Sequence, residues 1–227
     1  QTFNEESMTV NLKKKNFLIK SGIWKGYSLW NLYKKAKTPY SWHKELFEYS
    51  KKIGIKCFSS AFDFKAVDFL ETLNCPIYKV ASFEITDIPL LEKIAKTKKP
   101  VILSTGLSNI KEIDLAFNTL KKNGSKDITI LYCVSNYPSK IEDFNLKNIP
   151  FLKKRYGCKI GLSDHSLDNK VAIAAVVMGA EVIEKHIATE TQKKGLDIEF
   201  SLKGKEILKF KKDITEAFNL MGDENFL

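Results

Sequence analysis

The sequence lacks several signatures that would point directly to a function. It has no P-loop, no GxGxxG pattern and no catalytic serine elbow, so nucleotide binding through those loops and α/β-hydrolase chemistry have no support. No run of about 18 apolar residues is present, which excludes a membrane-spanning helix. The polar, acidic start QTFNEESMTV is not that of a signal peptide. Nothing resembles a nucleic-acid-binding motif, so no nucleic-acid or membrane partner is predicted.

Cysteine and histidine are scarce. The four cysteines, Cys57, Cys75, Cys133 and Cys158, form no CxxC pair. Buried reduced thiols in a cytoplasmic protein explain them best. There are three histidines, of which His43 lies at the start of a predicted helix and is expected to be structural.

The composition is that of one globular α/β domain. The chain has 227 residues, 44% of them hydrophobic and 28% charged. A net charge of +10 comes from 37 basic and 27 acidic residues, with lysines scattered in pairs and triplets. This pattern is typical of a solvated lysine-rich surface, and it is also compatible with a small anionic substrate.

From residue 54 onward, apolar runs of strand length alternate with amphipathic segments of helix length. The predicted strands are 55–61, 76–82, 100–106, 128–134, 159–165 and 181–187. The predicted helices are 41–53, 64–74, 87–97, 109–123, 145–156, 168–179 and 204–221. Pro89 behind Asp87 favours a helix start, and Gly124 and Gly179 suit helix ends. Short apolar strands between helices predict a parallel sheet with both faces covered.

Two architectures fit this alternation, an open doubly wound sheet and a (β/α)₈ TIM barrel. A repeat of about 25 to 30 residues is what the barrel requires. An open sheet concentrates its chemistry at one switch point, whereas a barrel gathers all the carboxyl ends of its strands around one mouth. Here nearly every predicted strand ends in polar groups: Ser59 and Ser60, Lys79 and Ser82, Ser104 and Thr105, Ser135, Ser163 to His165, and Lys185 and His186. We therefore predict an α/β (β/α)₈ barrel.

The predicted barrel is incomplete, because six strands are recognisable rather than eight. Residues 1–227 are expected to form one partial barrel domain, with βα repeats over 41–222. Residues 1–40 are expected to form a loop excursion over the barrel mouth, packed down by Trp24, Trp30 and Tyr33. The first residue is not Met, which favours a fragment.

His165 and His186 end two consecutive predicted strands, so a barrel would bring their imidazoles within a few ångströms of each other. Imidazole nitrogens at that separation suit Mn²⁺, Co²⁺ or Zn²⁺. The alternative is two separately hydrogen-bonded histidines, and position alone does not choose between them.

Other strand-end residues suggest an anion-binding pocket. Lys79 lies inside an apolar strand, where a lysine needs an anionic partner. That partner is either a phosphate or carboxylate group of a ligand or, in a purely structural role, the side chain of Glu84 or Asp164. Five strand-end hydroxyls could cradle phosphate oxygens: Ser60, Ser82, Ser104, Ser135 and Ser163. Glu84 and Asp197 are candidates for acid/base work or sugar binding, or else solvated loop carboxylates. SNYPS around Tyr137 indicates only a turn.

Five motifs together resemble the sialic acid synthase family in order and spacing. They are KVASFEITDIPLLEKIAKTKKPVILSTG, CVSNYPSKIEDFNL, GLSDHS, GAEVIEKHIATE and GLDIEFSL. TPYSWHKELFEY and KVASFEI are most similar to the pseudaminic acid synthase branch, since the N-acetylneuraminate branch more often has glycine in place of Phe83. The resemblance implies a cytoplasmic, homodimeric transferase of sialic acid biosynthesis that condenses phosphoenolpyruvate with an N-acetylated amino sugar and releases phosphate.

The resemblance also implies roles for residues. A divalent metal (Mn²⁺, Mg²⁺ or Co²⁺) would be held by His165 and His186. The residues implied to bind phosphoenolpyruvate are Lys79, Ser82, Ser104, Ser163, Ser60 and Ser135. Glu84, Tyr137 and Asp197 are implied to lie near the sugar and the metal-bound oxygens, as catalytic candidates. C3 of phosphoenolpyruvate would attack the open-chain sugar aldehyde, polarised by the metal, before water adds at C2 and phosphate leaves.

Three departures accompany the resemblance. The family begins with one strand that carries a Glu and a second strand that ends in Lys-x-Gln. Gln1 matches the final Gln of that second strand, and the Glu and the Lys have no counterpart here. The first two strands are therefore expected to be missing. The small C-terminal antifreeze-like domain is expected to be missing too, and Ala61 replaces the usual proline. One alternative is a truncated non-catalytic barrel remnant that binds a phosphorylated ligand or a sister subunit. Another is a related barrel aldolase or heptulosonate-phosphate-type synthase, which GLSDHS and IEKHIATE disfavour.

Overall fold

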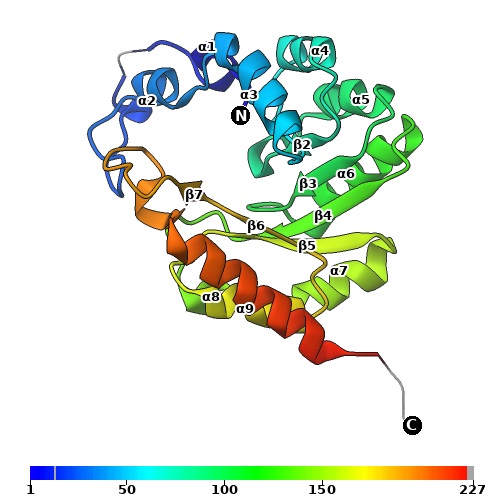
Figure 1. Cartoon of the computed structure of the whole chain (residues 1–227). Helices are drawn as coiled ribbons and strands as arrows, with labels where there is room; N and C mark the ends of the chain where they lie inside the picture. Colours follow the sequence, from blue (N-terminus) through cyan, green and yellow to red (C-terminus); the bar gives the residue numbers. More distant parts are fainter. Residues whose placement is uncertain (13, 224–227) are drawn as a thin grey trace. The chain divides into compact units, whose positions relative to one another are not determined.

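The computed structural model describes residues 1–12 and 14–223 (Figure 1). These residues form two compact units. The first unit comprises Gln1–Leu103 and Ser108–Ile128, and the second comprises Ser104–Leu107 and the residues from Thr129 onward. Each of the six predicted strands and seven predicted helices is present in the described ranges, with shorter bounds than predicted for most of them.

The first unit contains strands β1 (Ser59–Ser60) and β2 (Tyr78–Val80), and β3 (Val101–Ser104) except for its last residue. They pair in parallel and in chain order, with Ser60 opposite Lys79 and Lys79 opposite Ile102. Helices α3 (Tyr40–Lys52), α4 (Phe64–Thr72), α5 (Ile88–Lys96) and α6 (Ile110–Lys122) alternate with these strands. Parallel strands joined by helices are the βα repeat that the apolar pattern predicts.

Side-chain caps explain where the helices of the first unit begin. The Asp87 side chain accepts a hydrogen bond from the Leu90 N–H (3.1 Å) and Pro89 lies in the first turn, as predicted. Asn109 and Glu112 form a reciprocal capping box at the start of α6. Beyond the end of α6, Gly124 has φ +111°, a left-handed conformation that an L-residue rarely adopts.

The first forty residues contain more regular structure than the predicted loop excursion. Helices α1 (Glu5–Met8) and α2 (Leu29–Ala36) form there, with a short 3₁₀ turn at Lys15–Phe17. Ser28 caps α2 by accepting a hydrogen bond from the Asn31 N–H, and Leu32 is buried, so one apolar contact and one cap stabilise a short helix. The expected position of this segment over a barrel mouth stays a prediction.

The second unit contains strand β4 (Ile128–Cys133) except for its first residue, and strands β5 (Lys159–Asp164) and β6 (Val182–Lys185), again parallel and in chain order. Helices α7 (Asn148–Tyr156), α8 (Asn169–Val177) and α9 (Lys205–Met221) follow the strands, and α8 and α9 lie side by side (Figure 1). The sequence did not predict the parallel pair β7 (Ile187–Ala188) and β8 (Leu202–Lys203). Strands of two residues are too short to show a periodic pattern.

The six strands thus make a parallel α/β fold, consistent with an incomplete barrel. Cys75 and Cys133 are buried thiols as expected, whereas Cys57 and Cys158 are partly exposed, and none of these four described cysteines forms a disulfide. Within the described residues, no helix is both long and apolar enough to cross a membrane.

Candidate active site

His165 and His186 lie together at the carboxyl ends of β5 and β6. Asp164 pairs with Lys185 in the parallel register, so the residues that follow them are also neighbours. The two imidazole centroids are 5.3 Å apart with their planes at 50°. The prediction that the two histidines lie close together is therefore confirmed.

The environment of His165 selects one tautomer. His165 is 5% exposed, and its Nδ1 lies 3.1 Å from the Val134 carbonyl oxygen, which can only accept a hydrogen bond. Nδ1 therefore carries the proton, and Nε2 keeps its lone pair. Burial lowers the pKa of His165 below its ordinary value, so the ring stays neutral at neutral pH.

His186 is half-buried and faces a carboxylate. Its Nδ1 lies 3.7 Å from Asp197 Oδ2, and Asp197 comes from the turn before β8. Burial lowers the pKa of His186, while the negative charge of Asp197 opposes that shift. Two neutral imidazoles are suitable donors for a divalent transition metal. No group of three or more His, Cys, Asp or Glu side chains suited to a metal occurs among the described residues, so water or substrate oxygens would have to complete the coordination.

Two further aromatic rings contact the histidines. Tyr137 follows β4, is joined by a cis peptide to Pro138, and has its ring 4.4 Å from that of His165. Burial raises the pKa of Tyr137 to about 12, so its hydroxyl is a protonated donor at neutral pH. Phe200, which the sequence did not single out, packs against Tyr137 and both histidines.

Glu184 is a second residue that sequence reasoning missed. Its Oε1 accepts a hydrogen bond from Ser163 Oγ (2.7 Å), and its charge acts to raise the pKa of His165, of His186 and of Tyr137. A signal was available, because Glu184 and His186 are two positions apart at the end of one strand, a spacing that puts side chains on the same face.

A buried ion pair supports the same strand ends. Lys185 Nζ lies 2.8 Å from Asp164 Oδ2, with both side chains almost fully enclosed. Lys185 also donates to the Ser166 carbonyl oxygen. Asp164, which the sequence offered as a structural partner of Lys79, is therefore paired with Lys185.

The first unit carries another group of predicted site residues at the carboxyl ends of β1 and β2. Lys79 is 6% exposed, and Ser82 and Glu84 form the 3₁₀ turn directly after β2. Burial raises the pKa of Glu84 to about 7, against the opposing positive charge of Lys79. Within the described ranges, Glu84 Oε2 is buried without a hydrogen-bond partner. A buried acceptor of this kind suggests a proton or ligand donor that the described residues do not provide.

The six predicted phosphoenolpyruvate residues all lie at, or within two residues of, the carboxyl end of a parallel strand. Ser60, Lys79 and Ser82 belong to the first unit, and Ser104, Ser135 and Ser163 belong to the second. Ser163 is buried, and its hydroxyl already donates to Glu184. Their joint role in binding one ligand stays a prediction.

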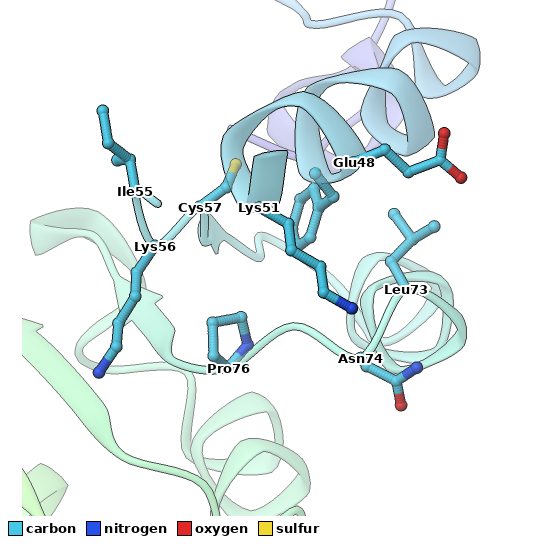
Figure 2. Close-up of a pocket in the computed structure, with 9 residues that line it drawn as sticks. Glu48, Lys51, Ile55, Lys56, Cys57, Leu73, Asn74 and Pro76 are labelled. Carbon is cyan, nitrogen blue, oxygen red and sulfur yellow. The ribbon is translucent and has the colours of Figure 1, made fainter. Parts of the chain in front are cut away.

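A cavity of about 420 Å³ in the first unit contains none of these residues (Figure 2). Figure 2 shows that its walls come from the end of α3 and from the chain before β1 and β2. Cys57 and Pro76, for example, precede β1 and β2 respectively. The cavity thus lies at the amino ends of the strands. In barrel enzymes the active site lies at the carboxyl ends, and the amino ends contribute to stability.

Parallel strands that bring histidines, carboxylates and a tyrosine together at their carboxyl ends are the arrangement of barrel-type α/β enzymes. The chain belongs to the NeuB family, whose sequence pattern matches residues 1–226. This match decides against the heptulosonate-phosphate synthases that the sequence left as an alternative.

Individual relatives agree with this assignment. The chain is 42% identical over 224 residues to a pseudaminic acid synthase of Helicobacter pylori and 40% identical over 223 residues to one of Campylobacter jejuni. Those alignments cover 99% and 98% of this chain, but 66% and 65% of the two synthases, so the chain spans slightly less than two thirds of their length. An N-acetylneuraminic acid synthetase from Leptospira borgpetersenii, solved with citrate, superposes with a TM-score of 0.83 at 35% identity, covering 88% of this chain and 70% of that one.

Proposed function

We propose that the protein to which these residues belong condenses phosphoenolpyruvate with an N-acetylated amino sugar and releases phosphate, as a transferase of nonulosonic acid biosynthesis. The observation that carries the proposal is the pair of neutral imidazoles, 5.3 Å apart, in a chain 42% identical to a pseudaminic acid synthase. That identity favours the pseudaminic acid precursor as the sugar.

The donor chemistry fits a divalent cation such as Mn²⁺, Mg²⁺ or Co²⁺. His165 would bind through Nε2, because its Nδ1 donates to the Val134 carbonyl oxygen. His186 is the second donor, with Asp197 close to its Nδ1. A cation bound there would supply Lewis-acid polarisation of the sugar aldehyde.

The remaining work falls to side chains of the chain itself. Lys79 and the strand-end serines would hold the phosphate and carboxylate of phosphoenolpyruvate through charge-assisted hydrogen bonds. C3 would then attack the aldehyde carbon, water would add at C2, and phosphate would leave. The protonated Tyr137 hydroxyl can donate to sugar oxygens, and Glu84, with a pKa of about 7, can exchange a proton near neutral pH.

Histidine substitutions in the whole protein test the proposal. We expect His165→Ala and His186→Ala each to abolish Mn²⁺-dependent phosphate release from phosphoenolpyruvate and an N-acetylated hexosamine, with the melting temperature nearly retained. His43→Asn is the matched control, because His43 is buried in the first unit against Thr2 and Pro39. Full, still metal-dependent activity in either alanine variant would refute the ligand assignment. No phosphate release by the unchanged protein with any N-acetylated amino sugar would refute the function.

A further inference from the structure

Phe200 occupies the third corner of a triangle formed with the two site imidazoles. Its ring centroid is 4.9 Å from that of His186 and 6.2 Å from that of His165, with interplanar angles of 75° and 85°. Both contacts are edge-to-face, a favoured geometry for aromatic rings. Phe200 is 2% exposed and also lies 5.4 Å from the Tyr137 ring, so one phenyl group contacts three candidate site residues.

Backbone hydrogen bonds hold the segment that carries Phe200 beside His186. The Leu202 N–H donates to the His186 carbonyl oxygen (2.9 Å), and β7 and β8 continue this connection by pairing Ile187 with Leu202. The turn before β8 is closed by Ser201 Oγ, which donates to the Asp197 carbonyl oxygen (2.7 Å). The short segment from Asp197 to Leu202 therefore places both a carboxylate and a phenyl ring next to His186.

We propose that Phe200 is a positioning residue that holds the imidazoles of His165 and His186 in the mutual orientation needed to bind one cation. The inference rests on the proposed function, because it takes the two histidines as the cation's protein ligands. An imidazole attached by two rotatable bonds can turn its ring unless neighbours fill the space around it. Phe200 contacts both rings with its edges or faces, whereas a flexible aliphatic chain would fill the volume without limiting ring rotation.

The test is Mn²⁺ binding to the whole protein, followed by the free-Mn²⁺ electron paramagnetic resonance signal. We expect Phe200→Met to weaken Mn²⁺ binding by about 10- to 100-fold, as loss of a residue that orients metal ligands typically does. Met keeps most of the buried volume, so the fold should survive, and Phe200→Leu is the second variant should Phe200→Met fail to fold. The matched control is Phe210→Met, because Phe210 is equally apolar and buried in the same unit but packs against Ala172 and Leu202.

A merely structural role predicts a different pattern, in which Phe200→Met and Phe210→Met lower the melting temperature alike and neither changes Mn²⁺ affinity. That result would overturn the inference while leaving the proposed function intact. If the unchanged protein bound no Mn²⁺, or His165→Ala bound it as tightly, the metal part of the proposed function would fail and the inference with it. Loss of affinity in Phe200→Met alone supports the positioning role.

Discussion

The carboxyl group of Glu84 is held where its protonated form is favoured. It follows β2 directly, and its Oε2 is buried with no partner among the described residues. The positive charge of Lys79 only partly offsets the cost of burying a carboxylate. Because its pKa differs between the folded and unfolded states, such a group makes the free energy of unfolding depend on pH.

Glu84→Gln should reduce the change in the free energy of unfolding between pH 5 and pH 8. The folded-state pKa of about 7 lies above the ordinary value of 4.5, so the folded protein binds more protons than the unfolded chain between those values. The stabilisation from protonated Glu84 is fully present below pH 4.5 and is lost as pH rises through 7. At pH 8 we expect the variant to exceed the unchanged protein in unfolding free energy by on the order of 1 to 3 kcal/mol. Urea unfolding at pH 5 and 8 measures this, and a constant difference at both pH values would contradict it.

Lys79→Met tests the proposed anion-binding role of Lys79, which is 6% exposed on β2. A charge-assisted hydrogen bond contributes roughly 1.5 to 3 kcal/mol, so the affinity of the whole protein for phosphoenolpyruvate, its proposed substrate, should fall about ten- to a hundredfold. The methionine side chain keeps most of the packing, and sugar affinity should change little. Isothermal titration with phosphoenolpyruvate is the measurement. A collapse of the melting temperature with unchanged phosphoenolpyruvate affinity would make Lys79 a structural partner of Glu84.

At the scale of elements, the close packing of β5 against β6 positions the histidine pair. Gly161 lies in β5 opposite Val182, and a Cβ added there would come within 2.2 Å of the Val182 carbonyl oxygen and 2.6 Å of Leu131 Cδ2. These atoms are backbone and strand core, which cannot move aside easily. A residue without a side chain is therefore required for β6 to pair with β5 in this register.

Gly161→Ala should consequently destabilise the protein by about 1 to 3 kcal/mol or more, the usual cost of overpacking a core, and should weaken Mn²⁺ binding as β5 and β6 separate. Gly195→Ala is a suitable control, because its nearest contact is the flexible end of the Gln192 side chain. Thermal unfolding and Mn²⁺ titration of both variants check the prediction. Equal melting temperatures for the two would show that β6 can shift without cost.

At the scale of the whole molecule, the first unit exposes an apolar stripe along α3. Trp42, Leu46, Tyr49 and Ile53 are 59%, 45%, 60% and 50% exposed. Their spacing of four, three and four residues places them on one face of the helix. Nearby, Ile55 and Phe58 before β1 are also exposed. A row of exposed apolar side chains on one helix face favours association.

A polypeptide consisting of residues 1–227 alone should therefore self-associate or aggregate. Exposed apolar side chains and the unpaired backbone groups of an edge strand both promote it. We expect Leu46→Glu with Tyr49→Lys to raise the monomer fraction in size-exclusion chromatography with light scattering. Replacing the exposed Lys44 and Glu48 of the same helix by glutamine is the control. A monomeric, cooperatively melting 227-residue protein would contradict this expectation.

Local patterns in the sequence determined the order of strands and helices. Apolar runs between polar turns predict β4 and β5, and Asp87 with Pro89 predicts the start of α5, because such signals depend on residues a few positions apart. The same logic placed His165 and His186 at consecutive strand ends. The motifs that resemble the sialic acid synthases were likewise legible in the sequence, and the family match confirms that resemblance.

Only the tertiary structure decided which side chains meet. Ser163 donates to Glu184, Lys185 pairs with Asp164, and Phe200 packs against both histidines, yet none of these contacts follows from sequence spacing. Phe200 reaches His186 through the two-residue strands β7 and β8, which are too short to leave a periodic signal. Burial acts in the same way, since the pKa of Glu84 rises because of what surrounds it rather than because of its neighbours in the chain. Sequence periodicity encodes local structure, whereas contacts and burial depend on the pairing of segments distant along the chain.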